Sequence, residues 1–114
     1  MGAETVIVKQ VQVEASDLGA RLFRNNCGKL PDRTGRWVEF GLQPGSGDLI
    51  GWVPTVITAD MVGKTFARFL SVECKTMKGR LQENQKSWRE TVNRNGGLAG
   101  VARNKEELSA ILKS

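Results

Sequence analysis

Two carboxylates and a lysine stand in this chain at spacings that suit phosphodiester chemistry. Asp48 follows the turn-forming residues Gly45-Ser46-Gly47 and precedes a short apolar run, and Glu73 stands two residues before Lys75. Because side chains on a strand alternate between its two faces, Glu73 and Lys75 are expected side by side on one face. If the strand that follows Asp48 is a neighbour of the strand that carries Glu73, the two carboxylates converge on one point.

Such a pair of carboxylates supplies the hard oxygen ligands that Mg²⁺ prefers, and the main-chain carbonyl of Cys74 is a candidate third ligand. A divalent ion held there would lower the pKa of a bound water and supply a nucleophile. Lys75 would orient that water or neutralise charge on the phosphorane. The chain contains no histidine, which excludes Ser-His-Asp and Cys-His catalysis, histidine-bound zinc and an imidazole base. The metal mechanism needs none of these.

Each feature also has a simpler interpretation. A Glu-x-Lys triplet on a strand can be a surface ion pair worth about 0–1 kcal/mol, and Gly-Ser-Gly-Asp can be an ordinary turn. The combination is more specific than its parts. An acidic residue at a strand start, a gap of about 25 residues, an apolar strand ending in Glu-x-Lys and a following basic helix together favour a nuclease.

The elements that must position these residues follow from periodicity and turn residues. We expect one α/β domain spanning residues 1–114, with a mixed central β-sheet flanked by helices. The segment from Glu4 to Leu18 is expected to be helical, with a strand as the alternative because its valines are β-branched. Strands are expected at 20–26, 36–42, 49–53, 65–75 and 98–102, and helices at 81–95 and 105–112. A turn or mobile loop is expected at 28–35, and a loop or single helical turn at 57–64.

Charge and cysteine content indicate partners and compartment. The formal net charge is +5, and between residues 64 and 105 ten basic residues face three acidic ones. Such a bias suits a phosphate backbone, although a solvated basic face is a common alternative. Cys27 and Cys74 have no metal-site or disulfide spacing, so buried, reduced thiols are expected. No apolar run reaches bilayer length and no export signal is recognisable, so a soluble protein is expected.

Several motifs resemble a known family. Phe23-Arg24-Asn25-Asn26, Gly47-Asp48-Leu49-Ile50-Gly51-Trp52, Val72-Glu73-Cys74-Lys75-Thr76, Gln85 and the segment 96–102 are similar, in the same order, to the virus-type replication-repair nuclease (VRR-NUC) domain of the PD-(D/E)XK superfamily. The resemblance implies an Mg²⁺- or Mn²⁺-dependent, structure-selective DNA endonuclease with Asp48, Glu73 and Lys75 as its motif residues. The family's phage and bacterial members are stand-alone small domains of this kind, so the resemblance implies the cytoplasm of a bacterial or phage-infected cell.

The resemblance also implies a metal-approaching glutamate in the first helix, for which Glu4 matches best and Glu14 is the alternative. Gln85 shares a helix face with Leu81, Trp88 and Val92. It is either a structural contact to nearby backbone or an active-site glutamine near the metal water or phosphate. The tryptophans are expected in the core or a dimer interface, with base stacking as the alternative. The expected DNA-binding residues are Arg24, Asn25, Asn26, Lys78, Arg80, Lys86 and Arg89.

The leading expectation is a Holliday-junction resolvase that acts as a homodimer, because a four-way junction has two-fold symmetry and is cut on two strands. Cleavage of flaps or nonspecific duplex is the next alternative. A noncatalytic basic DNA-binding module is the competing class. A restriction-type enzyme is disfavoured, since so short a chain leaves little surface for reading bases in the major groove.

Overall fold

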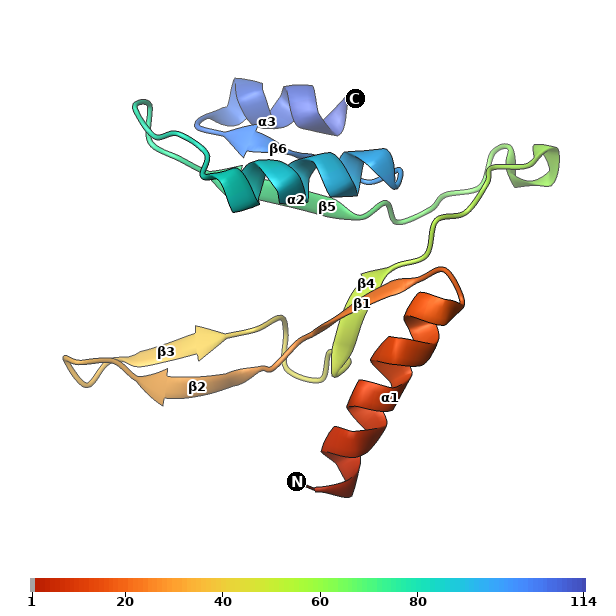
Figure 1. Ribbon diagram of the computed structural model, residues 1–114. Coiled ribbons are helices and arrows are strands. Elements are labelled where there is room, and N and C mark those ends of the chain that lie inside the picture. Colours follow the sequence, from red (N-terminus) through yellow and green to blue (C-terminus); the bar gives the residue numbers. More distant parts are fainter. Residues whose placement is uncertain (1) are drawn as a thin grey trace. The chain divides into compact units, whose positions relative to one another are not determined.

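The computed structural model describes residues 2–114, and its contacts group into two compact units, Met1–Val53 and Pro54–Ser114 (Figure 1). Helices and strands occur in both units, which confirms the α/β class. Within residues 2–114, no helix has the length and apolar character needed to cross a membrane. That the chain forms one domain stays a prediction.

The first unit begins with helix α1 (Ala3–Asp17), which confirms the expected helix over the strand alternative. Val8 and Ala15 are two turns apart on one face and both are buried. Gly19, at φ 89°, ends the helix. Around it, Ala20 N–H donates to the Ala15 carbonyl at 2.8 Å and Gly19 N–H to that of Ser16 at 3.2 Å. These two bonds are those of a Schellman motif, which turns the chain back along α1.

Strand β1 (Arg21–Arg24) follows and pairs antiparallel with β4 (Leu49–Trp52), so that Arg24 lies opposite Leu49. The Gln12 amide donates to the Leu22 carbonyl at 3.1 Å, which ties α1 to β1. Gly51 sits where a Cβ would collide with the Arg21 carbonyl oxygen. A glycine at this position therefore permits the close pairing that carries Asp48 to the start of β4.

A second antiparallel pair, β2 (Gly28–Pro31) with β3 (Trp37–Phe40), corrects the expectation of a loop at 28–35. The reason is Asp32, whose carboxylate accepts hydrogen bonds from Thr34 N–H at 2.8 Å, Thr34 Oγ1 at 2.7 Å and Arg36 N–H at 3.0 Å. These bonds, led by that of the Thr34 hydroxyl, lower the pKa of Asp32. The turn is confined to 32–36, and the residues on either side are free to pair.

The second unit contains a 3₁₀ turn, η1 (Ala59–Met61), and a parallel pair of strands, β5 (Leu70–Cys74) and β6 (Leu98–Ala102). Helix α2 (Glu83–Arg94) connects the two strands as a crossover, and α3 (Lys105–Leu112) follows. Val92 and Leu98 are buried, and Gly100 lies directly against Ile111 of α3. Strand β5 is shorter than the expected 65–75, because its ladder with β6 begins only at Leu70.

Strand pairing within residues 2–114 forms three two-stranded sheets, two antiparallel and one parallel. Both kinds of pairing expected of a mixed sheet are present, but each strand has a single partner instead of belonging to one continuous sheet. Trp37 is 71% exposed and is therefore not the core residue that its type suggests. Trp52 packs on Phe23 with ring centroids 5.3 Å apart, and Trp88 packs edge-on against Phe69 at 6.3 Å.

Candidate functional site

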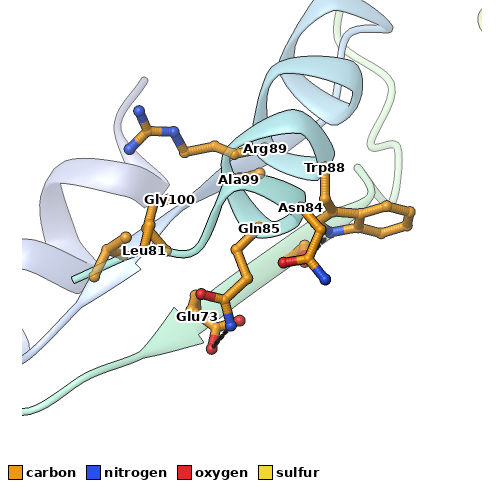
Figure 2. A pocket seen from close by; sticks show the side chains of 10 residues that line it. Glu73, Leu81, Asn84, Gln85, Trp88, Arg89, Ala99 and Gly100 are labelled. Atoms are coloured by element: carbon orange, nitrogen blue, oxygen red, sulfur yellow. Dashed lines mark hydrogen bonds between the residues drawn. The ribbon is translucent and has the colours of Figure 1, made fainter. Parts of the chain in front are cut away.

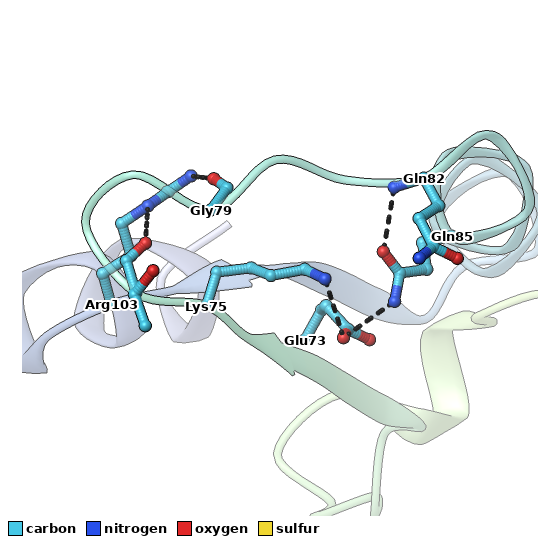
Figure 3. Close-up of polar contacts among 7 residues, drawn as sticks. Glu73, Lys75, Gly79, Gln82, Gln85 and Arg103 are labelled. Atoms are coloured by element: carbon cyan, nitrogen blue, oxygen red, sulfur yellow. Dashed lines mark hydrogen bonds and ion pairs between the residues drawn. The ribbon is translucent and has the colours of Figure 1, made fainter.

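Glu73 lies on β5 and Lys75 directly follows its last residue, and the two side chains meet on one side of the chain, as strand alternation predicts. The Lys75 ammonium is 3.7 Å from Glu73 Oε1, and the same oxygen accepts a hydrogen bond from the Gln85 amide at 3.0 Å (Figure 3). The Lys75 side chain is 19% exposed and that of Glu73 is 41% exposed. The pair is thus more enclosed than the exposed Lys29–Glu39 pair of the hairpin, at 61% and 72%. A simple surface ion pair does not describe it well.

Gln85 reaches Glu73 from the first turn of α2. Its amide oxygen accepts from Gln82 N–H at 2.9 Å, and the Gln82 side chain accepts in return from the backbone of Gln85. This reciprocal arrangement is a capping box, which satisfies two backbone donors of the helix start. The structural interpretation of Gln85 is confirmed, because its amide oxygen bonds to nearby backbone. Its amide nitrogen contacts Glu73, and a role near a metal-bound water or phosphate stays a prediction. The spacing Gln82-x-x-Gln85 was the available signal for the cap.

A pocket of about 270 Å³ lies between α2 and the β5–β6 pair, beside Glu73 (Figure 2). Trp88 fixes one wall, because its indole N–H donates to Ser71 Oγ at 2.8 Å. Of the expected DNA-binding residues on α2, Arg89 lines the pocket, whereas Lys86 pairs with Glu83 at 3.4 Å. The lining residues are Ser71, Glu73, Leu81, Asn84, Gln85, Trp88, Arg89, Ala99, Gly100 and Val101.

The turn that follows Lys75 is held by a residue that the sequence did not single out. Arg103 donates from Nε to the Thr76 carbonyl at 3.2 Å and from Nη2 to the Gly79 carbonyl at 2.9 Å (Figure 3). Glu107 balances its charge at 3.6 Å. A Cβ at Gly79 would lie only 3.1 Å from the Lys75 Cβ, so the turn folds closely over the lysine stem. In the sequence, Arg103 was only one of many basic residues.

The same turn leads to two of the expected DNA-binding residues. Lys78 and Arg80 are both exposed, on either side of the glycine that Arg103 holds. Neither side chain makes an ion pair or hydrogen bond with other residues of the described chain. Their charges are thus free to meet a phosphate.

Asp48 lies in the first unit, at the entrance to β4. Asn25 N–H donates to its carbonyl at 2.9 Å, which extends the β1–β4 ladder by one residue. The Asp48 side chain is exposed and its carboxylate has no polar partner within residues 2–114. Asn25 itself is occupied by bonds to the turn before Asp48, whereas Asn26 Oδ1 accepts only from Arg24 Nη2, at 3.3 Å. The three expected DNA contacts of this segment are therefore not equivalent.

Glu4 and Glu14 both lie on α1 and both side chains are exposed. Ten residues of helix separate them by about 15 Å along the axis, so only one of them can approach a given ion. Glu4 lies one turn before the buried Val8 and close to its face of the helix, whereas Glu14 is turned well away from that face.

No cluster of three or more His, Cys, Asp or Glu side chains suited to a metal ion occurs within residues 2–114. The donors predicted from the sequence are the Asp48 carboxylate in the first unit and the Glu73 carboxylate and Cys74 carbonyl in the second. All are hard oxygen ligands, which fits Mg²⁺ or Mn²⁺. Cys27 and Cys74 are free and exposed, so the expectation of buried thiols was wrong. Cys74 follows the strand alternation away from Glu73, and Cys27 lies just before the solvated hairpin.

Comparison with known proteins identifies the family of the chain. The family model of the VRR-NUC domain matches residues 6–106, a stretch that runs from α1 into α3 and includes Asp48, Glu73, Lys75 and Gln85. No curated protein and no solved structure matches the chain. The match spans parts of both units and includes Glu14, whereas Glu4 lies before its first residue.

Proposed function

The chain belongs to the VRR-NUC family and is therefore a nuclease that acts on DNA, and we propose that it is a metal-dependent, structure-selective endonuclease. The observation that carries the proposal is Glu73. Its Oε1 is held by both Lys75 and Gln85, while its Oε2 has no partner within the described chain. A carboxylate fixed through one oxygen and open at the other is prepared to bind a ligand.

Asp48, Glu73 and the Cys74 carbonyl are the proposed ligands of Mg²⁺ or Mn²⁺. When bound, the ion would supply a Lewis acid that polarises the phosphate and makes a bound water acidic. That Asp48 and Glu73 bind the same ion rests on the resemblance of both segments to the family's motif. The absence of a partner for the Asp48 carboxylate within residues 2–114 is consistent with a ligand role.

Lys75 and Gln85 perform the remaining chemistry of the site in this proposal. The Lys75 ammonium, enclosed and adjacent to Glu73, donates to the attacking water or to a phosphate oxygen as negative charge develops there. The Gln85 amide gives one hydrogen to Glu73 and has a second with which to orient water or phosphate. Neither role needs a titrating base on the protein, in agreement with the absence of histidine.

Glu4 is the better candidate for the further ligand from α1. Gln12 is level with Leu22, and the three residues from Leu22 to Asn25 advance the strand by about 10 Å. The antiparallel helix covers that distance in about seven residues, which leads from Gln12 back to the first turn of α1. Glu4 therefore lies near the level of Asn25 and Asp48, whereas Glu14 lies at the opposite end.

A direct test incubates labelled junction, flap and duplex DNA with the wild-type protein and with Lys75→Ala, in Mg²⁺, Mn²⁺ or EDTA. We expect metal-dependent cleavage by the wild type and loss of at least about two orders of magnitude in Lys75→Ala, as for other lost charge-stabilising donors. Lys29→Ala is the matched control, because it breaks an exposed Lys–Glu pair in the hairpin. Binding without cleavage of any substrate would support a noncatalytic DNA-binding module instead.

We further propose that the substrate is branched DNA and that the chain acts on Holliday junctions as a homodimer. The junction's two-fold symmetry matches a C2 dimer that brings two sites to two strands. Sedimentation across a concentration series tests the dimer, and paired nicks on opposing strands test resolution. A monomer that cuts flaps alone would indicate the flap nuclease instead.

A further inference from the structure

The segment that delivers Asp48 is built from turns. Gly41 and Gly45 have φ angles of 81° and 87°, which side chains other than glycine rarely adopt. Ser46 N–H donates to the Gln43 carbonyl at 3.0 Å. No regular helix or strand extends through residues 41–48, so the position of Asp48 depends on the contacts that this segment makes with its surroundings.

The Asn25 side chain makes the shortest of these contacts, and the Cys27 thiol adds longer ones to the Gln43 carbonyl and to Ser46 Oγ. The Asn25 Nδ2 group donates to Ser46 Oγ at 2.8 Å and to the Gly47 carbonyl at 2.9 Å. Its Oδ1 accepts from Leu42 N–H at 3.1 Å. An asparagine amide has two hydrogens to donate, and both are in use. Asn25 thus links the beginning and the end of the segment before Asp48.

The backbone of Asn25 fixes the same segment from the other side. Its N–H donates to the Asp48 carbonyl at 2.9 Å, directly beyond the last register pair of β1 and β4, Arg24 with Leu49. Asp48 therefore has a main-chain bond to Asn25 and follows two residues that the Asn25 side chain binds. Together these bonds restrict where the Asp48 carboxylate can lie.

We propose that Asn25 is a positioning residue, which holds the Asp48 carboxylate in place for the divalent ion. In this role Asn25 does not contact DNA. The inference rests on the proposed role of Asp48 as a metal ligand. A carboxylate that is already fixed before the metal binds loses less conformational freedom when it coordinates the ion. The site therefore binds the metal more tightly. A phosphate would compete with Ser46 and Gly47 for amide hydrogens already in use.

The test compares Asn25→Ala with Asp48→Ala in the full chain. Mn²⁺ binding without DNA is followed by calorimetry, and junction binding is followed in EDTA. We expect Asn25→Ala to weaken Mn²⁺ binding about tenfold, to raise the Mn²⁺ concentration for half-maximal cleavage by the same factor, and to leave junction affinity in EDTA within twofold. A DNA contact would give the reverse, weaker junction binding with unchanged Mn²⁺ binding, and would overturn the proposal.

Two further variants separate positioning from stability. Asn104 is the N-cap of α3, and its Oδ1 accepts a hydrogen bond from Glu107 N–H at 2.9 Å. Asn104→Ala removes this cap and so destabilises the chain at a site unrelated to Asp48. It is expected to keep wild-type Mn²⁺ affinity. Should Asn25→Ala fail to fold, Asn25→Asp carries the test, because it retains the acceptor for Leu42 but loses both donated bonds.

The outcomes also distinguish this inference from the proposed function. If the wild type binds Mn²⁺ and cleaves, Asp48→Ala loses both, and Asn25→Ala and Asn25→Asp match the wild type, the positioning role is refuted and the nuclease stands. If the wild type neither cleaves nor binds Mn²⁺ in an Asp48-dependent manner, the proposed function itself fails.

Discussion

Two neighbouring side chains fix the Glu73 carboxylate in place and so distinguish it from other glutamates on strands. Lys75 approaches it along the strand and Gln85 approaches it from α2, both at Oε1. The first contact could be predicted from the sequence, because alternation along a strand places residues 73 and 75 on one face. The second could not, since it depends on the angle at which α2 crosses β5 and on the rotamer that the capping box imposes.

Replacing Gln85 with Glu tests this arrangement through its pH dependence. The new carboxylate retains the acceptor for Gln82 N–H but faces Glu73 across a hydrogen-bond distance. Two carboxylates so close raise the pKa of at least one of them. Since the ligand form of Glu73 is ionised, we expect slower cleavage and an acidic limb of the pH–rate profile that moves to higher pH.

The control for that variant is Gln82→Glu, which adds the same charge at the adjacent cap residue of α2. Its pH–rate profile is expected to match that of the wild type within about 0.3 pH units, a twofold change in proton concentration. A shift of equal size in both variants would mean that general electrostatics, and not contact with Glu73, moves the limb.

At the scale of elements, helices were more predictable than strands. The ranges of α2 and α3 follow from apolar periodicity and from flanking Gly and Asn residues. Strand β2 was missed because Pro31-Asp32 and two glycines indicate a turn, and composition does not reveal that Asp32 confines this turn to a few residues. The pairing of strands depends on contacts far apart in sequence, which local patterns do not encode.

The Asp32 turn makes the hairpin sensitive to acid. Hydrogen bonds to the ionised carboxylate lower its pKa below the ordinary 3.8, so the stabilisation is present above pH 3.8 and is lost as pH falls through the lower folded-state value. The protection factors of the β2 and β3 amides, which correct for the intrinsic pH dependence of exchange, are expected to fall in that range. In Asp32→Asn the same amides should exchange faster already at neutral pH, while those of β5 and β6 remain unchanged.

The turn between β5 and α2 depends on Arg103 in a comparable way. Arg103→Lys keeps the positive charge but cannot reach both the Thr76 and Gly79 carbonyls with a planar fork. We expect cleavage to fall roughly tenfold, equivalent to about 1.4 kcal/mol, because the turn over Lys75 loosens. Junction binding in EDTA should stay within twofold. Equal losses of cleavage and binding would instead make Arg103 a DNA contact.

For the molecule as a whole, the net charge of +5 favours binding to DNA of any structure and gives no selectivity for branched DNA. From the ten basic residues between 64 and 105, the sequence selected Lys78, Arg80, Lys86 and Arg89 as DNA contacts. In the structure, Arg68 donates to the Gly96, Gly97 and Ser114 carbonyls and Arg103 holds the turn over Lys75, so part of this charge is committed to the fold. Lys78 and Arg80 are exposed and uncommitted.

This division predicts which residues set the salt dependence of binding. Each neutralised phosphate contributes a slope of about −0.9 to the plot of log K against log salt for duplex DNA. We expect Lys78→Ala and Arg80→Ala each to reduce the magnitude of the slope by about one, measured in EDTA with junction DNA. Lys29→Ala should leave it unchanged, because its ammonium is paired with Glu39. Unchanged slopes in Lys78→Ala and Arg80→Ala would place the phosphate contacts elsewhere on the chain, with the pocket residue Arg89 the next to be replaced.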